Sequence, residues 1–334
     1  MPDGRRCTMA EIINDNIDFR LYLNQTEASQ NVRPARDFVA EAKHYLRART
    51  KTKRTFLPWP KCNGNFEFRL GEVTIWAGQN GSGKTDLTTQ MALSLVGQGE
   101  KVCIASFEMK PRTTIGRMVR QFAGTNPYAE EYQSADGVEE LELLYDDFGG
   151  WSDGSLWLYD QTKTAEAEVV LGMIKYCADT LGITHVVVDS LMKCIRAEDD
   201  YNAQKDFVDQ LCAMAKDCNI HIHLVHHVKK PAKENDKPDK SDIKGSGAIT
   251  DQVDNVFIVY RNKAKEDDVR ANGTRSKMAA DADCYLLCRK QRNYELSGDG
   301  EPTISLWRHT DAGQFVANQG DSAQFFVNYP HVAS

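Results

Sequence analysis

The sequence Gly78-Gln79-Asn80-Gly81-Ser82-Gly83-Lys84-Thr85 decides the fold of this protein. A short, mostly apolar run at residues 72–77 precedes it, and residues 87–95 follow with apolar side chains at helical spacing. A strand, a glycine-rich turn and a helix N-terminus are the context in which the pattern G-x-x-x-x-G-K-[ST] forms a phosphate-binding loop. The motif therefore predicts a site for a nucleoside triphosphate.

Each residue type in this loop has a chemical reason. The glycines let the backbone turn its N–H groups toward phosphate oxygens, and the helix N-terminus adds partial positive charge. We expect Lys84 to reach the β- and γ-phosphates and the Thr85 hydroxyl to hold Mg²⁺. Gly78 to Thr85, with the following Asp86, form the expected site for ATP, or another nucleoside triphosphate, and Mg²⁺.

Length and composition narrow the class of protein. A chain of 334 residues suffices for one large α/β domain with an appendage. No apolar run approaches the roughly 20 residues of a membrane span, and the polar N-terminus is not a secretory signal. Nine cysteines without a C-x-x-C pair favour a reducing, cytoplasmic compartment over a zinc site or a disulfide framework. The net charge of −7 still allows nucleic-acid binding, because a ring or groove can concentrate Lys and Arg locally.

The chain divides into three predicted parts: a helical N-terminal arm at 1–55, an ATPase domain at 56–315 and a C-terminal tail at 316–334. In the arm, residues 34–49 have one narrow apolar face of helical period, and a basic run follows. The sequence Pro58-Trp59-Pro60 is typical of a stiff connector entering a domain. The arm has too few apolar residues for a core of its own, so we expect it to dock on another surface.

Strands and helices alternate through the predicted ATPase domain. The expected strands are 72–77, 102–107, 156–159, 185–189 and 220–226, and the expected helices after the first are 113–122, 165–181 and 201–218. Continuous apolar strands between amphipathic helices predict an α/β fold with a mainly parallel sheet covered on both faces. Strands at 256–260, 282–289 and 303–307 lack long intervening helices and predict an antiparallel extension of that sheet. Residues 263–280, charged and poor in apolar side chains, are expected to form a mobile loop or hairpin tip.

Two carboxylates follow predicted strands and are candidates for catalysis. Asp189 ends an apolar run, which places it at the edge beside the phosphate loop, where a Walker-B aspartate reaches the magnesium shell. Its alternative role is to cap the next helix. Glu108 ends the strand after the first helix and is placed to polarise the attacking water; its alternative is a surface loop residue.

Histidines and basic residues supply the remaining candidates. His221, His223, His226 and His227 lie in one strand, where alternating His can mark a metal site, but no Cys or carboxylate stands nearby at ligand spacing. We expect His226 or His227, at the strand's end, to sense the γ-phosphate. The charged segment 229–249 ends in Lys244-Gly245-Ser246-Gly247, whose freed backbone N–H groups and lysine suit a DNA phosphate, although a solvated loop can have the same composition.

Together these segments resemble the hexameric replicative helicases with RecA-type motors. Phage primase–helicases and mitochondrial Twinkle are the nearest in this likeness, and bacterial DnaB is further off. The resemblance covers about residues 60 to 315. It rests on Gly78 to Thr85, Ser106-Phe107-Glu108-Met109, Val187-Val188-Asp189-Ser190, His226-His227-Val228-Lys229-Lys230-Pro231, Asp242-Ile243-Lys244-Gly245-Ser246-Gly247-Ala248 and Arg289-Lys290-Gln291-Arg292, in family order.

The resemblance implies roles for particular residues. Glu108 matches the catalytic base, and His227 the γ-phosphate sensor, where the bacterial branch has Gln. The segment Lys244 to Gly247 matches the loop that grips single-stranded DNA in a central channel. Arg292 is similar to an arginine finger acting on the neighbouring subunit, with Lys290 beside it, and Arg261 matches a residue that packs on the nucleotide base.

The same resemblance implies a homo-hexamer or heptamer that unwinds duplex DNA during replication, with primase and polymerase as further partners. It also implies a bacterial or phage-infected cell as the setting, with a mitochondrial origin left open. No primase module fits into residues 1–60, and the arm is similar only in placement to a linker helix that docks on the adjacent subunit. Two alternatives share the phosphate loop: a RecA- or RadA-like recombination ATPase, and a KaiC-like regulatory ATPase ring.

Overall fold

The computed structural model describes most of the predicted ATPase domain and little of the N-terminal arm. The described residues are 12–13, 35–36, 38–40, 42–43, 54–63, 66–161, 163–195, 200–229, 236–245, 247–292 and 302–326. Within the predicted arm, Ile12–Ile13 form the short strand β1, and the described residues between 35 and 43 are helical and exposed. The rest of the arm's predicted helix, its basic run up to residue 53 and Ser246 lie outside the described residues.

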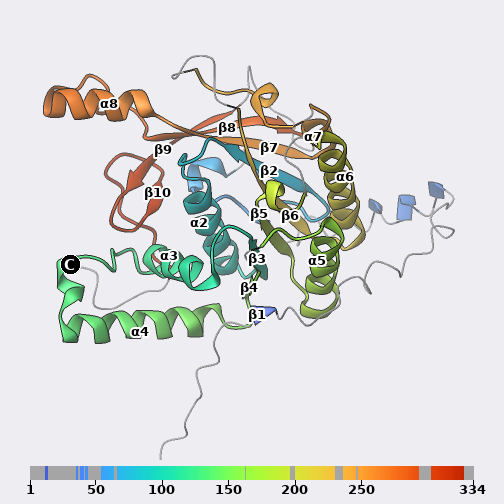
Figure 1. Cartoon of the computed structure of the whole chain (residues 1–334), viewed down its shortest axis with the longest axis horizontal. Coiled ribbons are helices and arrows are strands. Elements are labelled where there is room, and N and C mark those ends of the chain that lie inside the picture. The colour runs from blue at the N-terminus through green and yellow to red at the C-terminus, as the bar shows by residue number, and fades with distance from the viewer. Residues whose placement is uncertain are drawn as a thin grey trace, which may run out of the picture.

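A mixed sheet forms the centre of the molecule (Figure 1), in the order β1-β4-β3-β5-β6-β2-β7-β8-β9-β10. Strands β1 through β7 pair in parallel, and β8, β9 and β10 extend the sheet as antiparallel strands. Their bounds are β2 (Val73–Gly78), β3 (Val102–Ser106), β4 (Leu156–Tyr159), β5 (His185–Asp189), β6 (His221–His227), β7 (Asn255–Arg261), β8 (Cys284–Gln291), β9 (Thr303–His309) and β10 (Gln314–Val316). The predicted parallel sheet and its antiparallel extension are confirmed.

Helices lie on both faces of the sheet. From α2 on, the helices are α2 (Lys84–Gly97), α3 (Pro111–Ala123), α4 (Ala135–Ser152), α5 (Ala167–Leu181), α6 (Tyr201–Asp217), α7 (Gly247–Gln252) and α8 (Lys263–Asn272). Of these, α2 and α3 pack on one face and α5 and α6 on the other. Short 3₁₀ turns are η3 (Pro60–Cys62), η4 (Glu130–Gln133), η5 (Leu191–Lys193), η6 (Lys240–Asp242) and η7 (Gly273–Arg275). None of the helices among the described residues is long and apolar enough to cross a membrane.

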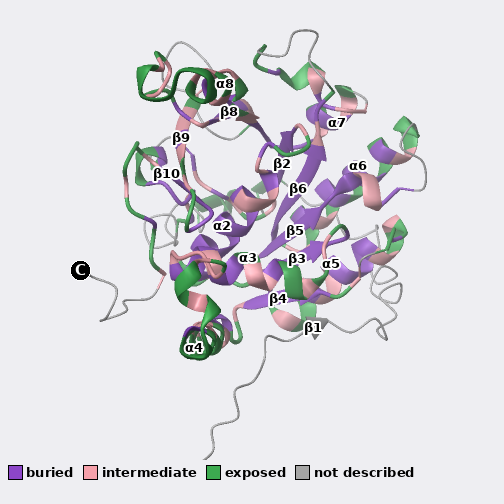
Figure 2. Ribbon diagram, turned by 60° about the vertical axis from the view of Figure 1, so that its left-hand side comes forward, coloured by how far each residue is buried: buried purple, intermediate pink, exposed green. Residues whose placement is uncertain are grey.

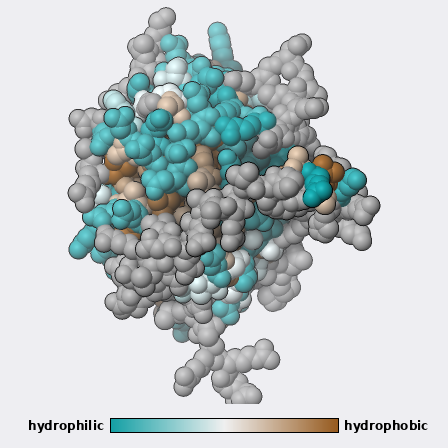
Figure 3. Space-filling model, turned by 90° about the vertical axis from the view of Figure 1, so that its right-hand side faces the viewer, coloured by the Kyte–Doolittle hydropathy of each residue, from teal (hydrophilic) through white to brown (hydrophobic). Residues whose placement is uncertain are grey.

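The sheet separates two hydrophobic cores, and the parallel strands β2 to β7 are buried along nearly their whole length (Figure 2). On one face, α5 and α6 contribute Ile174, Phe207 and Leu211. On the other, α2 and α3 contribute Met91 and Phe122. Burial on both faces explains why the parallel strands read as continuous apolar runs. The outer surface on the side of α5, α6 and α7 is mainly hydrophilic where it is described (Figure 3).

Two segments differ from the sequence-based expectation. The sequence predicts a mobile loop or hairpin tip at residues 263–280, but the first ten of them form α8. Asn262 caps this helix by accepting a hydrogen bond from the N–H of Lys265, and Lys265 pairs with Asp283 at 2.7 Å. A local cap and an ion pair with a residue beyond the helix, not an apolar stripe, hold the helix in place. The acidic helix α4 is not among the predicted helices; it has only three buried residues and packs on the core through Leu144, Phe148 and Trp151.

The connector and the C-terminal hairpin pack against the first helix. The indole N–H of Trp59, in the proline-flanked connector, donates to the Phe315 carbonyl at 2.8 Å. Residues 317–326 continue from β10 over the ends of α2 and α3, where Phe325 lies against Gly124 and Phe326 packs near Gly97. The predicted tail from 316 is therefore structured in its first part, and residues 327–334 lie outside the described part of the chain.

Candidate nucleotide-binding site

The predicted phosphate loop connects β2 to α2 at the carboxyl edge of the parallel strands. Gly81 and Gly83 have φ of 73° and 91°, a conformation that L residues with side chains rarely adopt. Because this backbone leads directly into α2, the first N–H groups of the helix have no partner within the helix and are available to a ligand. Lys84 is buried, and its ammonium donates to the carbonyls of Gly78 at 3.0 Å and Gln79 at 2.9 Å. The buried Ser82 hydroxyl has no partner within the described chain, as expected for a group that faces a ligand.

Neighbouring strands bring three more predicted residues to this edge. Asp189, at the end of β5, lies with its Oδ2 3.5 Å from the Thr85 hydroxyl. Glu108 follows β3 and accepts a hydrogen bond from the Ser190 hydroxyl at 3.1 Å. His227, at the end of β6, places its Nε2 4.0 Å from the Glu108 carboxylate. Ends of parallel strands meet at one edge, which is why residues more than 100 positions apart in the sequence converge here.

Burial sets the electrostatics of the site. It raises the pKa of Asp189 to about 6, with repulsion from Glu108 adding to the effect and Lys84 opposing it. Burial also lowers the pKa of Lys84, although the carboxylates of Asp189 and Glu108 oppose that shift. The site thus holds two closely spaced carboxylates near one buried ammonium. A hydroxyl and carboxylates at this spacing suit the hard oxygen preference of Mg²⁺, so Thr85 and Asp189 fit the predicted metal.

These groups line one open, polar cavity of about 420 Å³. Two arginines that the sequence reasoning did not select also line it: Arg117 from α3 and Arg308 from β9. Both pair with Asp86, at 3.4 Å and 2.7 Å respectively. No sequence motif identifies these two arginines as site residues, because Arg117 lies in the middle of α3 and Arg308 lies in β9, far along the chain. The full lining is Asn80, Gly81, Gly83, Lys84, Thr85, Asp86, Glu108, Arg117, Asp189, His227 and Arg308.

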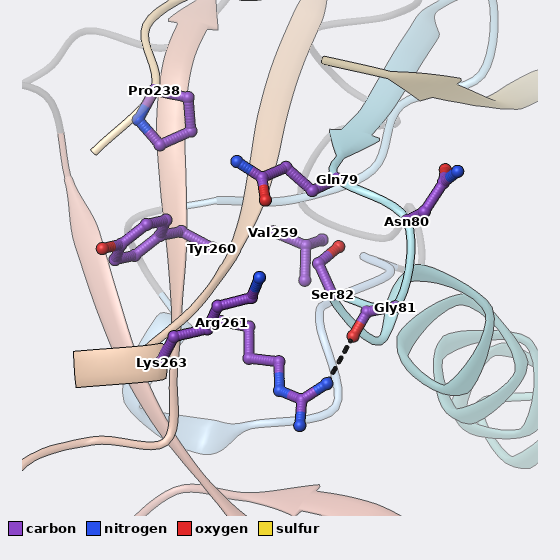
Figure 4. A pocket seen from close by; sticks show the side chains of 9 residues that line it. All are labelled: Gln79, Asn80, Gly81, Ser82, Pro238, Val259, Tyr260, Arg261 and Lys263. Atoms are coloured by element: carbon purple, nitrogen blue, oxygen red, sulfur yellow. Dashed lines mark hydrogen bonds between the residues drawn. The ribbon is translucent and has the colours of Figure 1, made fainter. Parts of the chain in front are cut away.

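Arg261 lies on the other side of the phosphate loop, in a much smaller pocket of about 20 Å³ (Figure 4). One of its nitrogens donates to the Gly81 carbonyl at 3.1 Å, while two others bind the Glu266 carboxylate at 2.5 and 2.8 Å. Tyr260 and Pro238 line the same pocket. The structure therefore puts Arg261 against the phosphate loop, and its contact with a nucleotide base stays a prediction.

Lys290 and Arg292 do not line either of these cavities. The Lys290 ammonium donates to the carbonyls of Thr250 and Asp251 at 2.8 and 2.7 Å, at the C-terminal end of α7. Arg292 pairs with buried Asp254 at 3.1 Å and donates to two further carbonyls there. Within one chain both residues cap α7, so a role in catalysis requires a second subunit.

The predicted DNA-binding segment is joined to the end of β6 by backbone hydrogen bonds. The Lys244 N–H donates to the carbonyl of His227 at 2.9 Å, and Val228 bridges to Ile243. The carbonyl of Lys244 lies 2.6 Å from Nε2 of buried His226. Gly245 has φ of 99°, and a Cβ there would lie 2.3 Å from a Gln204 oxygen, so this turn requires glycine.

Fold and site together define a P-loop NTPase of the RecA type. The chain matches the family model "DnaB-like helicase C terminal domain" over residues 66–299. It belongs to that family. Membership implies nucleoside triphosphate binding and hydrolysis.

Two similar proteins are both described as replicative DNA helicase DnaB, from two strains of Helicobacter pylori. The protein from strain 26695 is 24% identical over 235 residues, which cover 67% of this chain and 48% of the relative. The protein from strain J99 is 26% identical over 199 residues, covering 58% of this chain and 41% of the relative. This chain thus spans about half the length of the relatives it matches.

Solved structures share the fold. A DnaB-like replicative helicase, described with its interactions with primase, superposes with a TM-score of 0.64 at 16% identity, covering 86% of this chain and 67% of that chain. A second solved structure, described as an ATPase domain, superposes with a TM-score of 0.65 at 17% identity, covering 83% of this chain and 96% of that chain.

Proposed function

We propose that this protein is an ATP-driven motor that assembles into a ring, translocates on single-stranded DNA and unwinds duplex DNA during replication. The observation that carries the proposal is the hydrogen-bonded connection between His227, at the nucleotide edge, and Lys244, at the start of the predicted DNA loop. A translocating motor must transmit the state of its bound nucleotide to the segment that holds the DNA. Here a direct backbone hydrogen bond joins the nucleotide edge to the proposed DNA loop.

Hydrolysis is assigned to residues of the large cavity. Glu108 is positioned to polarise the attacking water, and the hydroxyl of Ser190 orients its carboxylate. His227, 4.0 Å from Glu108, is placed to register the γ-phosphate. Lys84 and the N–H groups of the loop stabilise charge on the phosphates. Mg²⁺, held by Thr85 and through water by Asp189, would neutralise further charge on the phosphates.

Single-stranded DNA is the proposed track, contacted by Lys244, Gly245, Ser246 and Gly247. A lysine beside backbone N–H groups recognises phosphates without reading sequence, which suits a motor that must move along any DNA. Arg292, with Lys290 beside it, is proposed to complete the site of a neighbouring subunit in a hexamer or heptamer. Primase and polymerase remain proposed partners; a primase interaction is described for one protein of similar fold.

ATPase assays with and without single-stranded DNA, together with electron microscopy of the particles, test the proposal. A closed ring whose ATP turnover rises with single-stranded DNA supports a helicase motor. Filaments on DNA would favour the recombination ATPase. A ring whose turnover ignores DNA would favour the regulatory ATPase and contradict our proposal.

A further inference from the structure

Arg308 enters the nucleotide cavity from an unexpected direction. It lies on β9, in the antiparallel extension, and its guanidinium donates to the Asp86 carboxylate at 2.7 Å. On the hairpin, Arg308 stands opposite Phe315 of β10, with its guanidinium 5.8 Å from the ring centre. The same ring lies against Gly83, where a Cβ would come within 2.9 Å of it. The hairpin therefore touches the phosphate loop through Phe315 and its helix through Arg308.

The position of Asp86 indicates which part of a nucleotide lies nearby. Lys84, Thr85 and Asp86 open α2, and the first amide bonded within the helix is that of Leu87, to the Gly83 carbonyl. The amides before it are the groups that cradle the α- and β-phosphates. Lys84 and Thr85 serve the β/γ side and the metal. The Asp86 amide, next along the chain, is left for the phosphate nearest the sugar.

A carboxylate beside a bound phosphate is repulsive unless cations offset it. Asp86 has two such cations, Arg308 and Arg117, and all three residues line the cavity. The cluster carries a net positive charge, from two guanidiniums and one carboxylate. Arg308 lines the cavity and has 43% of its side chain exposed, so part of it is open to a ligand there.

We propose that Arg308 is a nucleotide-binding residue supplied by the same chain, which binds the α-phosphate while Asp86 positions it. The inference rests on the proposed nucleotide site but not on DNA unwinding. Arg308 differs in this respect from Arg292, which is proposed to act on the neighbour's nucleotide.

The test measures binding of ADP, GDP and CDP, without DNA, to the wild type, to Arg308→Ala and to Arg120→Ala. Arg120 is the matched control because it donates to Thr310 and Asp311 of the same hairpin from α3, outside the cavity. A charged hydrogen bond at a partly exposed site predicts an about tenfold weaker affinity for all three nucleotides in Arg308→Ala. Arg120→Ala should bind like the wild type.

Three results would overturn the proposal. Unchanged affinity in Arg308→Ala would remove Arg308 from the site. A loss that depends on the base would assign it to the base instead of the phosphate. An equal loss in Arg120→Ala would attribute the effect to the hairpin's position. Failure of the helicase proposal would be distinguishable, because it would appear as turnover that is insensitive to DNA while nucleotide binding persists.

Discussion

The imidazole Nε2 of His226 lies 2.6 Å from the carbonyl oxygen of Lys244. A carbonyl only accepts, so this nitrogen carries the proton and His226 is held in one neutral tautomer. Burial lowers the pKa of His226 to about 4, although the hydrogen bond to Lys244 opposes the shift. The neighbouring His227 faces Glu108 across the nucleotide edge. Two adjacent histidines thus face opposite ways, one toward the loop proposed to hold DNA and one toward the site of hydrolysis.

Hydrolysis should depend on Glu108 even though nucleotide binding does not. Glu108→Gln keeps the hydrogen bond from Ser190 but removes the base, so kcat should fall by about 10²- to 10⁴-fold while nucleotide affinity stays near the wild type. Lys84→Ala should lose turnover because the phosphate cradle loses its buried cation. Steady-state kinetics and nucleotide titration separate the two effects. Normal turnover in Glu108→Gln would remove this residue as the base.

DNA binding should weaken when Lys244 loses its charge. Lys244→Ala should lower the affinity for single-stranded DNA and reduce the slope of log K against log salt by about one unit per lost phosphate contact. Lys240→Ala is a matched control, because Lys240 lies in η6 of the same segment. Titrations across a salt series measure both variants. Equal slopes for the wild type and Lys244→Ala would move the DNA site elsewhere.

Arg292 should act across a subunit boundary. Lys84→Ala and Arg292→Gln should each be inactive alone, yet mixed rings should regain hydrolysis at interfaces that pair an intact loop with an intact finger. Glutamine at 292 retains a hydrogen-bond donor for the carbonyls at the end of α7. An arginine finger from a neighbouring subunit raises kcat by roughly three to five orders of magnitude, so even a few restored interfaces should give measurable hydrolysis. No recovery in verified mixed rings would show that Arg292 acts within its own chain or not at all.

Stability should fall in mild acid because of buried histidines at the opposite edge of the sheet. His221 donates from Nδ1 to the Arg69 carbonyl, and His223 accepts from the Trp76 indole at 3.2 Å. Burial lowers the pKa of His221 to about 4 and that of His223 well below its usual value. Between about pH 4 and 6.5 these histidines bind more protons in the unfolded chain, so their contribution to stability is complete above about pH 6.5 and decreases as the pH falls.

The pKa shift of His221 corresponds to about 3 kcal/mol across that window. Chemical denaturation from about pH 7.5 to about pH 4.5 measures the effect. His221→Gln should reduce the dependence, with that of His223 remaining, whereas His309→Gln, at the half-buried end of β9, serves as the control. An unchanged dependence in His221→Gln would show that other groups cause the acid sensitivity.

Gln90 should contribute strongly to the docking of the C-terminal hairpin. Its side-chain amide donates to the Phe315 carbonyl and accepts from the Phe315 N–H, each at 2.8 Å, in a buried setting. In Gln90→Ala the Phe315 carbonyl still accepts from the Trp59 indole, but the Phe315 N–H stays buried without its partner, which should cost about 1–3 kcal/mol. The free energy of unfolding measures this cost. Gln98→Ala, which removes a similar but partly exposed pair with Phe56, should cost less.

Local sequence was sufficient for the phosphate loop and the strand ends. Gly81, Gly83 and Lys84 specify a loop conformation with chemistry that depends on adjacent residues alone. Asp189 and Glu108 were identifiable because each follows an apolar strand, and parallel strands end at one edge. The α/β fold followed from the same alternation of buried strands and amphipathic helices.

Tertiary structure alone decided which remote side chains join that site. Arg308 reaches Asp86, 222 positions earlier, only because β9 and β10 fold back over α2. Within the chain, Arg292 contacts Asp254 and the end of α7, and no local sequence pattern predicts these contacts. Helix α8 likewise depends on contacts with Asp283 and Arg261. The periodicity of apolar residues indicates which face of a segment is buried. These pairings instead depend on how segments far apart in the sequence pack together.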